Sequence, residues 1–205
     1  MPQKILILSQ NDRHHRLETL GDMITEWLTD VKGVQTEVSH DQAMLHQMSD
    51  FDLCLVCFTA SQLTDREERA LDSSVRDGKP VFAIHSATVV NEKSEMYIDM
   101  IGGRFVKHSP YHEFQVQIED KEHPITQGVV DFKITDELYI LDRAPQNAHL
   151  LASAVWEDKS QPMVYTRKHG KGNVLYNALG HDEAAFNNPM FQKLVVGGIK
   201  WLLQA

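Results

Sequence analysis

Short apolar runs alternate with helical patterns over the first 84 residues, and this alternation constrains the fold more than any other feature. Leu17–Val31 carries apolar residues at helical spacing, and Gly33 ends that segment. Thr64–Glu67 has the sequence of a capping box and predicts a second helix, which Gly78 closes. Strands that alternate with helices predict a parallel sheet with helices on both faces. The runs with the length and composition of buried strands are residues 4–8, 34–38, 52–58 and 81–84.

The second half of the chain has the pattern of an antiparallel section. Apolar and polar residues alternate over Glu113–Glu119, as in a strand with one exposed face. His169–Gly172 predicts a hairpin loop, and Asn188 with Pro189 begins a final amphipathic helix. No repeat or linker interrupts the chain, so we predict a single domain over residues 1–205. Further strands are predicted at residues 134–141, 150–155, 162–167 and 173–179.

Charge and length exclude several functional classes. The chain has a formal net charge of −9, and its 20 lysines and arginines are scattered. Nucleic-acid binding needs a basic patch or stripe, so we expect no nucleic-acid partner. The first apolar run, Ile5–Leu8, is too short for a signal peptide or a membrane span, which predicts a cytoplasmic protein with no membrane partner. A chain of 205 residues buries enough surface to fold without disulfides or a structural metal.

Histidines follow three of the predicted strands, among eleven in the chain. In an open parallel sheet, the ligand crevice lies outside the carboxyl ends of the strands. We therefore expect these strand-end side chains to share one site. They are His14 and His15 after the first strand, His85 and Ser86 after the fourth, and His181 and Asp182 after the last.

His85 has the most informative surroundings. Small residues flank it in the sequence Ala-Ile-His-Ser-Ala, directly after a buried strand. This is the pattern of a nucleophile elbow, where small neighbours let one side chain stand exposed on a tight turn. The elbow position here holds an imidazole rather than a serine or a cysteine.

Five segments, in order, resemble the trehalose-utilisation ThuA-like family. The resemblance implies the fold of the class I glutamine amidotransferases, a flavodoxin-like three-layer α/β sandwich with a mostly parallel central sheet and added antiparallel strands. It also implies a role in the metabolism of trehalose, related glycosides or their keto-sugar derivatives. The segments are Ala83–Ala87, His123–Thr126, Asp136–Tyr139, Pro162–Val164 with Gly170–Gly172, and Leu179–Asp182.

The resemblance also carries implications for individual residues. In the amidotransferases the elbow holds the catalytic cysteine, and His85 stands in its place here; His181 is similar to their catalytic histidine. Cys54 and Cys57 cannot substitute for the missing nucleophile, because both lie inside a predicted buried strand. Glutamine hydrolysis by a thiolate is therefore not expected.

We assign roles to the candidate site residues on this basis. His85 and His181 are expected to act as acid–base groups or metal ligands, with Glu137 as their carboxylate partner. Glu137 and Tyr139 are predicted to share one face of a strand, since side chains alternate with period two. The structural alternative for this pair is a hydrogen-bonded anchor for the added strands. Candidate substrate-binding residues are His14, His15, Tyr139, Ser86 and Asp182.

A divalent transition metal such as Zn²⁺ is the one cofactor that the sequence suggests. His108 and His112 are four residues apart, but Pro110 argues against a helix that would place them on one face. In a loop, His112 could still join His85 and His181 as a ligand, and we favour it over His108 because it directly precedes a strand.

Two other functions stay open. The protein could be a non-catalytic binder of a sugar or another small ligand that kept the fold and lost the nucleophile. It could also be an interaction subunit that forms a homodimer through a sheet edge or the late hairpin, with Met96 and Met100 exposed at the contact. His123, which precedes Pro124, is expected to shape a turn. The residues interpreted as surface histidines are His40, His46, His149 and His169.

Overall fold

A nine-stranded sheet forms the centre of the molecule in the computed structural model, which describes residues 2–204. The strand order is β2-β1-β3-β4-β11-β10-β9-β6-β7. The parallel part comprises β1 (Gln3–Ser9), β2 (Val34–Ser39), β3 (Leu53–Cys57), β4 (Val81–Ile84) and β11 (Gly172–Asn177). The antiparallel part comprises β10 (Lys159–His169), β9 (Ala148–Trp156), β6 (His112–Ile118) and β7 (Phe132–Asp136).

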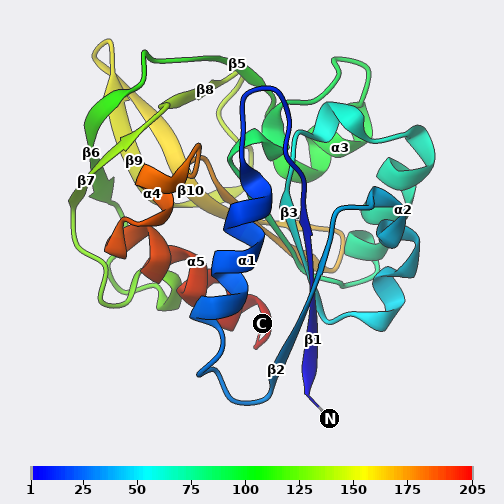
Figure 1. Ribbon diagram of the computed structural model, residues 1–205. Helices are drawn as coiled ribbons and strands as arrows, with labels where there is room; N and C mark the ends of the chain where they lie inside the picture. Colours follow the sequence, from blue (N-terminus) through cyan, green and yellow to red (C-terminus); the bar gives the residue numbers. More distant parts are fainter. Residues whose placement is uncertain (1, 205) are drawn as a thin grey trace.

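Helices cover both faces of this sheet, which gives the three layers expected from the alternating pattern (Figure 1). One face carries α1 (Leu17–Trp27), α4 (Glu183–Phe186) and α5 (Pro189–Leu202). The other carries α2 (Asp65–Arg76), α3 (Glu95–Ile101) and the 3₁₀ segment η1 (Gln42–Asp50). Shorter 3₁₀ turns are η2 (Ala60–Gln62), η3 (His85–Thr88) and η4 (Pro124–Thr126). The fold class predicted from the sequence is confirmed.

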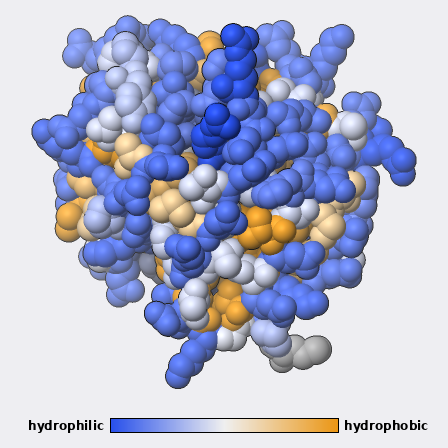
Figure 2. Space-filling view, in the orientation of Figure 1, coloured by the Kyte–Doolittle hydropathy of each residue, from blue (hydrophilic) through white to orange (hydrophobic). Residues whose placement is uncertain are grey.

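The core follows from the apolar strands. All residues of β3, β4 and β11 are buried, because helices pack on both sides of these central strands. Cys54 and Cys57 are among them, and burial raises the pKa of both thiols well above the ordinary range. Hydrophilic side chains cover most of the face seen in Figure 2. Within residues 2–204, no helix is long and apolar enough to cross a membrane.

The predicted boundaries of α2 are right, whereas the helix predicted over Leu17–Val31 is longer than α1. The capping box is present at α2, where Thr64 N–H donates to Glu67 Oε2 over 2.7 Å. α1 ends at Trp27, although the apolar pattern continues to Val31. The chain tightens there, since Val31 N–H donates to the carbonyl oxygen of Leu28 three residues back.

The predicted strand 134–141 is two separate strands. β7 ends at Asp136, and β8 (Tyr139–Leu141) leaves the main sheet to pair with β5 (Phe105–His108). Glu137 therefore lies in the turn between two strands, and the period-two argument that linked it to Tyr139 was wrong. The β5–β8 ribbon lies near the ends of the parallel strands, towards the top of Figure 1.

Two surface predictions are also wrong. His169 is 4% exposed, and its Nε2 lies 2.6 Å from Asp72 Oδ1 on α2. The β10–β11 hairpin packs so tightly on α2 that a Cβ at Gly170 would lie 2.6 Å from Arg76 Cα. Met100 is fully buried, whereas Met96 is 36% exposed.

Candidate functional site

Three histidines and one glutamate converge at the carboxyl ends of the parallel strands. His15 follows β1, His85 follows β4, His181 follows β11, and Glu137 follows β7. Each offers one potential ligand atom, and these atoms lie within 4.8 Å of one another. We call this group of four the histidine–glutamate centre.

The turn after β4 fixes the orientation of His85. This residue has a φ of +46°, in the left-handed region that few non-glycine residues adopt. Its Nδ1 lies 2.8 Å from the carbonyl oxygen of Ala178, which can only accept, so Nδ1 carries the hydrogen. Tyr176 OH donates to the His85 carbonyl over 3.0 Å and fixes the backbone of the turn. The side chain thus presents Nε2 to the centre.

His85 Nε2 is buried and has no hydrogen-bond partner among the described residues. Burial, together with the nearby imidazoles of His15 and His181, lowers the pKa of His85 well below its ordinary value. The ring is therefore neutral at pH 7 and directs a lone pair into the centre.

Asp12 orients His15 in the same way. His15 Nδ1 lies 2.9 Å from each carboxylate oxygen of Asp12, and Thr59 Oγ1 also donates to this carboxylate. Although burial opposes ionisation, hydrogen bonds from Thr59 and His15 lower the pKa of Asp12 to about 2. Burial outweighs the carboxylate at His15 itself and lowers the pKa of its imidazole. The Nδ1 atom of His15 thus contacts Asp12, and its Nε2 atom faces the centre.

Glu137 lies between the histidines. Its Oε2 is 3.2 Å from His181 Nδ1 and 3.9 Å from His85 Nε2, while its Oε1 is 3.6 Å from His108 Nδ1. Burial would raise the pKa of Glu137, but the adjacent His181 lowers it. Burial would likewise lower the pKa of His181, but Glu137 raises it. Glu137 and His181 thus lie at ion-pair distance inside the centre, although His181 Nδ1 makes no well-aligned hydrogen bond.

Asp136 supports this arrangement, and sequence reasoning did not single it out. The side chain is fully buried and accepts backbone hydrogen bonds from Glu137 and Gly180, each over 2.7 Å, and from His181 over 3.2 Å. It thereby joins the turn after β7 to the loop after β11. Burial raises the pKa of Asp136 to about 7. Its position at the end of a buried strand, inside the Asp-Glu-Leu-Tyr run, was the available signal.

A pocket of about 370 Å³ opens onto the centre. The ring of Tyr139 lies 4.0 Å from that of His85, centroid to centroid, and its hydroxyl lies 3.3 Å from His15 Nε2. The exposed His14 stands at the rim, and the β5–β8 ribbon supplies one wall. The lining residues are His14, His15, Val89, Phe105, His108, Glu137, Tyr139 and His181.

Three other candidate residues lie outside the centre. His112 takes no part in it, because its Nδ1 lies 2.7 Å from the Pro110 carbonyl oxygen and its ring is 5.3 Å from that of Trp156. Ser86 is fully buried, with its Oγ unpaired among the described residues. Asp182 caps α4 by accepting from Ala184 N–H over 3.0 Å. Of the two histidines His108 and His112, only His108 therefore lies near Glu137.

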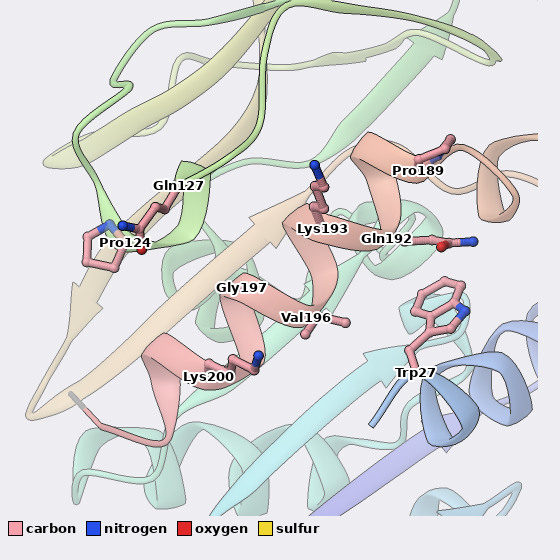
Figure 3. Close-up of a pocket in the computed structure, with 9 residues that line it drawn as sticks. All are labelled: Trp27, Pro124, Gln127, Pro189, Gln192, Lys193, Val196, Gly197 and Lys200. Carbon is pink, nitrogen blue, oxygen red and sulfur yellow. The ribbon is translucent and has the colours of Figure 1, made fainter. Parts of the chain in front are cut away.

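A larger concavity of about 590 Å³ lies elsewhere, between α1, α5 and the η4 turn (Figure 3). Trp27 and Val196 provide apolar surface there, and Lys193 and Lys200 provide charge. The lining contains no histidine, carboxylate or thiol, so it offers neither an acid–base pair nor a metal site. The lining residues are Trp27, Pro124, Gln127, Pro189, Gln192, Lys193, Val196, Gly197 and Lys200.

Comparison with known proteins bears on the family of the chain. The family model described as ThuA, trehalose utilisation, matches residues 4–202. The chain belongs to the ThuA family. Among curated proteins, none matches it.

Solved structures agree with this ThuA-family assignment. A protein described as ThuA-like from Parabacteroides merdae has a TM-score of 0.83 at 19% identity, with 99% of this chain and 90% of that chain covered. Another from Bacteroides uniformis has a TM-score of 0.83 at 16% identity, with 98% and 91% covered. A Thermoplasma acidophilum protein described as part of a GMP synthase has a TM-score of 0.66 at 12% identity, with 100% and 96% covered. At these identities, the similarity is evidence for the fold alone.

Proposed function

We propose that this ThuA-family protein is an enzyme that acts on a carbohydrate derivative, such as a trehalose-related glycoside or its keto form, at the histidine–glutamate centre. The observation that carries the proposal is the convergence of His15, His85, Glu137 and His181 beside a pocket, which all of them but His85 line. Ligand sites in open α/β sheets lie at this edge. The family description, trehalose utilisation, supports a sugar as the substrate class.

The pocket has features that suit a sugar ring. Its volume of about 370 Å³ lies near the lower end of the range for small-molecule sites, about 300–1,000 Å³. Phe105 offers an aromatic wall to the apolar face of a ring, while His14 and His108 offer nitrogens to hydroxyl groups. Tyr139 is 2% exposed, so a substrate would reach only the edge of its ring.

The available side chains restrict the chemistry. Glutamine hydrolysis by a thiolate does not fit, because both cysteines are buried in β3 and the elbow holds His85. The Glu137–His181 pair can exchange a proton with a hydroxyl group or with carbon next to a carbonyl. Hydrolysis, isomerisation and proton abstraction are each compatible with this pair.

A substrate screen tests the proposal. Glycosides and their 3-keto forms are assayed for turnover, with and without divalent metals, by the wild type and by the His85→Ala/His181→Ala variant. We expect the double variant to lose turnover while it keeps its fold by circular dichroism. His112→Ala is the matched control, since it removes an imidazole outside the centre. Full activity in the double variant would show that the site is assigned wrongly.

A non-catalytic sugar-binding protein is the second candidate function. The observation that favours it is the elbow, which keeps its left-handed turn at His85 without a nucleophile of the amidotransferase type. The same screen, read by calorimetry, separates the two functions. Tight binding of a glycoside without chemistry supports the binder, and turnover excludes it.

A further inference from the structure

We infer that His15, His85, Glu137 and His181 together bind one divalent first-row transition ion of the Zn²⁺ type. The inference deepens the proposed function, on which it rests for the nature of the substrate but not for binding of the ion. The ligand set differs from the one expected from the sequence, which was His85, His112 and His181. His15 and Glu137 are ligands here, and His112 is not.

The first argument is the orphaned nitrogen of His85. Its Nε2 is fully buried, has no hydrogen-bond partner among the described residues and lies 3.9 Å from Glu137 Oε2. A buried polar atom without a partner is costly, so such atoms are rare unless a water, an ion or a ligand satisfies them. Because Nδ1 donates to the Ala178 carbonyl, Nε2 is an acceptor and requires a proton donor or a cation.

The second argument is the outer shell of the histidines. Metal-binding histidines usually donate their second ring N–H to a carboxylate or a backbone carbonyl, which fixes the tautomer and the ring plane. His15 makes this contact with Asp12, at 2.9 Å, and His85 makes it with Ala178, at 2.8 Å. The loop of His181 is held by the buried carboxylate of Asp136. The imidazoles of His15 and His85 are therefore oriented before a ligand arrives, while Asp136 fixes the backbone that carries His181.

The third argument is electrostatic. The Nδ1 atoms of His15 and His85 contact Asp12 and Ala178, which leaves the Nε2 atoms to the centre, and the two ring centroids are 5.2 Å apart. Glu137 adds a negative charge to the same space. A divalent cation would replace the proton of His181 beside this carboxylate and accept the lone pair of His85 Nε2. Three imidazoles and a single carboxylate favour Zn²⁺ or a neighbouring transition ion over Mg²⁺ and Ca²⁺, which prefer oxygen ligands.

Geometry permits such an ion after a small adjustment. Ligand atoms of a tetrahedral zinc site stand about 3.3 Å apart, since metal–ligand distances are about 2.0–2.1 Å. The candidate atoms here lie within 4.8 Å of one another, so side-chain shifts of about 1 Å would close the shell. His15, Glu137 and His181 also line the pocket, so a substrate oxygen could reach the ion from that side as a fifth ligand.

Metal titration of chelator-treated protein tests the inference. Zn²⁺ and Co²⁺ are titrated into the wild type by calorimetry and, for Co²⁺, by visible absorption, with Mg²⁺ as the comparison ion. We expect one equivalent of Zn²⁺ or Co²⁺ to bind, Co²⁺ to show the absorption of a nitrogen-ligated site, and Mg²⁺ not to bind. Absence of stoichiometric binding by either transition ion would overturn the inference.

Variants assign the bound ion to the centre. His85→Ala and His181→Ala are each expected to weaken Zn²⁺ binding at least 100-fold, whereas His112→Ala leaves it unchanged. The His181 side chain lies in a loop and is 17% exposed, so its variant remains informative if the buried His85→Ala variant fails to fold. A wild-type affinity in His181→Ala, or a loss confined to His112→Ala, would contradict the assignment.

The two proposals can fail separately. If glycosides are turned over by protein that binds no metal, the metal inference falls and the proposed function stands. If one ion binds at the centre but no glycoside is bound or converted, the proposed function falls and the metal inference stands.

Discussion

His85 combines a strained backbone with an oriented ring. A non-glycine residue at a φ of +46° costs on the order of 1–3 kcal/mol, which the surrounding contacts must offset. Tyr176 supplies one of these contacts, because its hydroxyl bonds both the His85 carbonyl and Thr88 Oγ1. Backbone strain concentrated at a buried residue of the histidine–glutamate centre points to selection for function rather than for stability alone.

Tyr176→Phe is therefore expected to act on both the fold and the site. Loss of the hydroxyl leaves Thr88 Oγ1 as the remaining donor to the buried His85 carbonyl, so the free energy of unfolding in urea should fall by about 0.5–1.5 kcal/mol. The Zn²⁺ affinity should fall as well, because His85 is less firmly placed. The control is Tyr165→Phe, whose equally buried hydroxyl bonds the Ile101 carbonyl away from the elbow. A similar loss of stability in both variants, with unchanged Zn²⁺ affinity in both, would show that Tyr176 is merely structural.

The individual site residues were predicted unevenly. His85 and His181 were found because they directly follow buried strands whose direction the sequence sets. His112 was wrongly placed in the site because the chain turns away at Ser109 and Pro110. The turn is held by a hydrogen bond from Ser109 N–H to the Leu138 carbonyl, just before β8. The sequence pattern does not separate β8 from β7, so this contact could not be predicted. Asp136 was missed because its role is to accept hydrogen bonds from a loop 44 residues away.

At the level of elements, local signals predicted what local interactions determine. The capping box of α2, the hairpin of β10 and β11 and the Asn-Pro start of α5 each depend on neighbouring residues, and all are present. The break between β7 and β8 depends instead on Asp136, which accepts from Gly180 and His181 far along the chain. Tertiary hydrogen bonds of this kind leave no periodic trace in the sequence.

The η4 turn provides a prediction about pH. His123 caps it, with Nδ1 accepting from Ile125 N–H over 3.2 Å. Burial and the nearby His149 lower the pKa of His123. Below about pH 6.5 the unfolded chain therefore binds more protons at this residue than the folded chain does, and the free energy of unfolding falls as the pH falls.

His123→Asn should remove this contribution, because asparagine can still cap the turn but does not titrate. We expect wild type and variant to unfold at similar urea concentrations at about pH 7.5, and the variant to lose less stability than the wild type at about pH 5.5. An equal decline in both proteins would assign the pH dependence to other groups.

On the scale of the whole molecule, the centre ties together distant segments. Its side chains come from residue 15, from the middle of the chain and from residue 181, and they meet where the parallel and antiparallel parts of the sheet adjoin. The fold class was predictable, since buried apolar strands alternate with helices. The way in which the ribbon of β5 and β8 closes over the strand ends was not, because it depends on contacts between segments far apart in sequence.

An ion bound by such distant segments should stabilise the entire fold. Binding to the folded state alone adds about 2.7 kcal/mol to the free energy of unfolding when the free ion is at 100 times its Kd. We expect Zn²⁺ to raise the thermal midpoint of the wild type and EDTA to reverse the change. His181→Ala should show little increase; an equal increase in both proteins would place the ion elsewhere.

We further propose that the protein associates as a homodimer. Within residues 2–204, β2 and β7 are the edge strands of the main sheet, and unpaired edges are common sites of pairing between chains. Light scattering at micromolar concentration should then give the mass of two chains. A monomer under these conditions would remove this proposal without affecting the histidine–glutamate centre, whose side chains all come from a single chain.

Anomalous X-ray diffraction at the zinc edge, from crystals grown with Zn²⁺, tests the central claim most directly. If the histidine–glutamate centre binds the ion, one peak should appear about 2.0–2.2 Å from each of four ligand atoms. These atoms are a ring nitrogen of His15, of His85 and of His181, and a carboxylate oxygen of Glu137. Crystals without a peak at this position, or with zinc held by His108 or His112 instead, would contradict it.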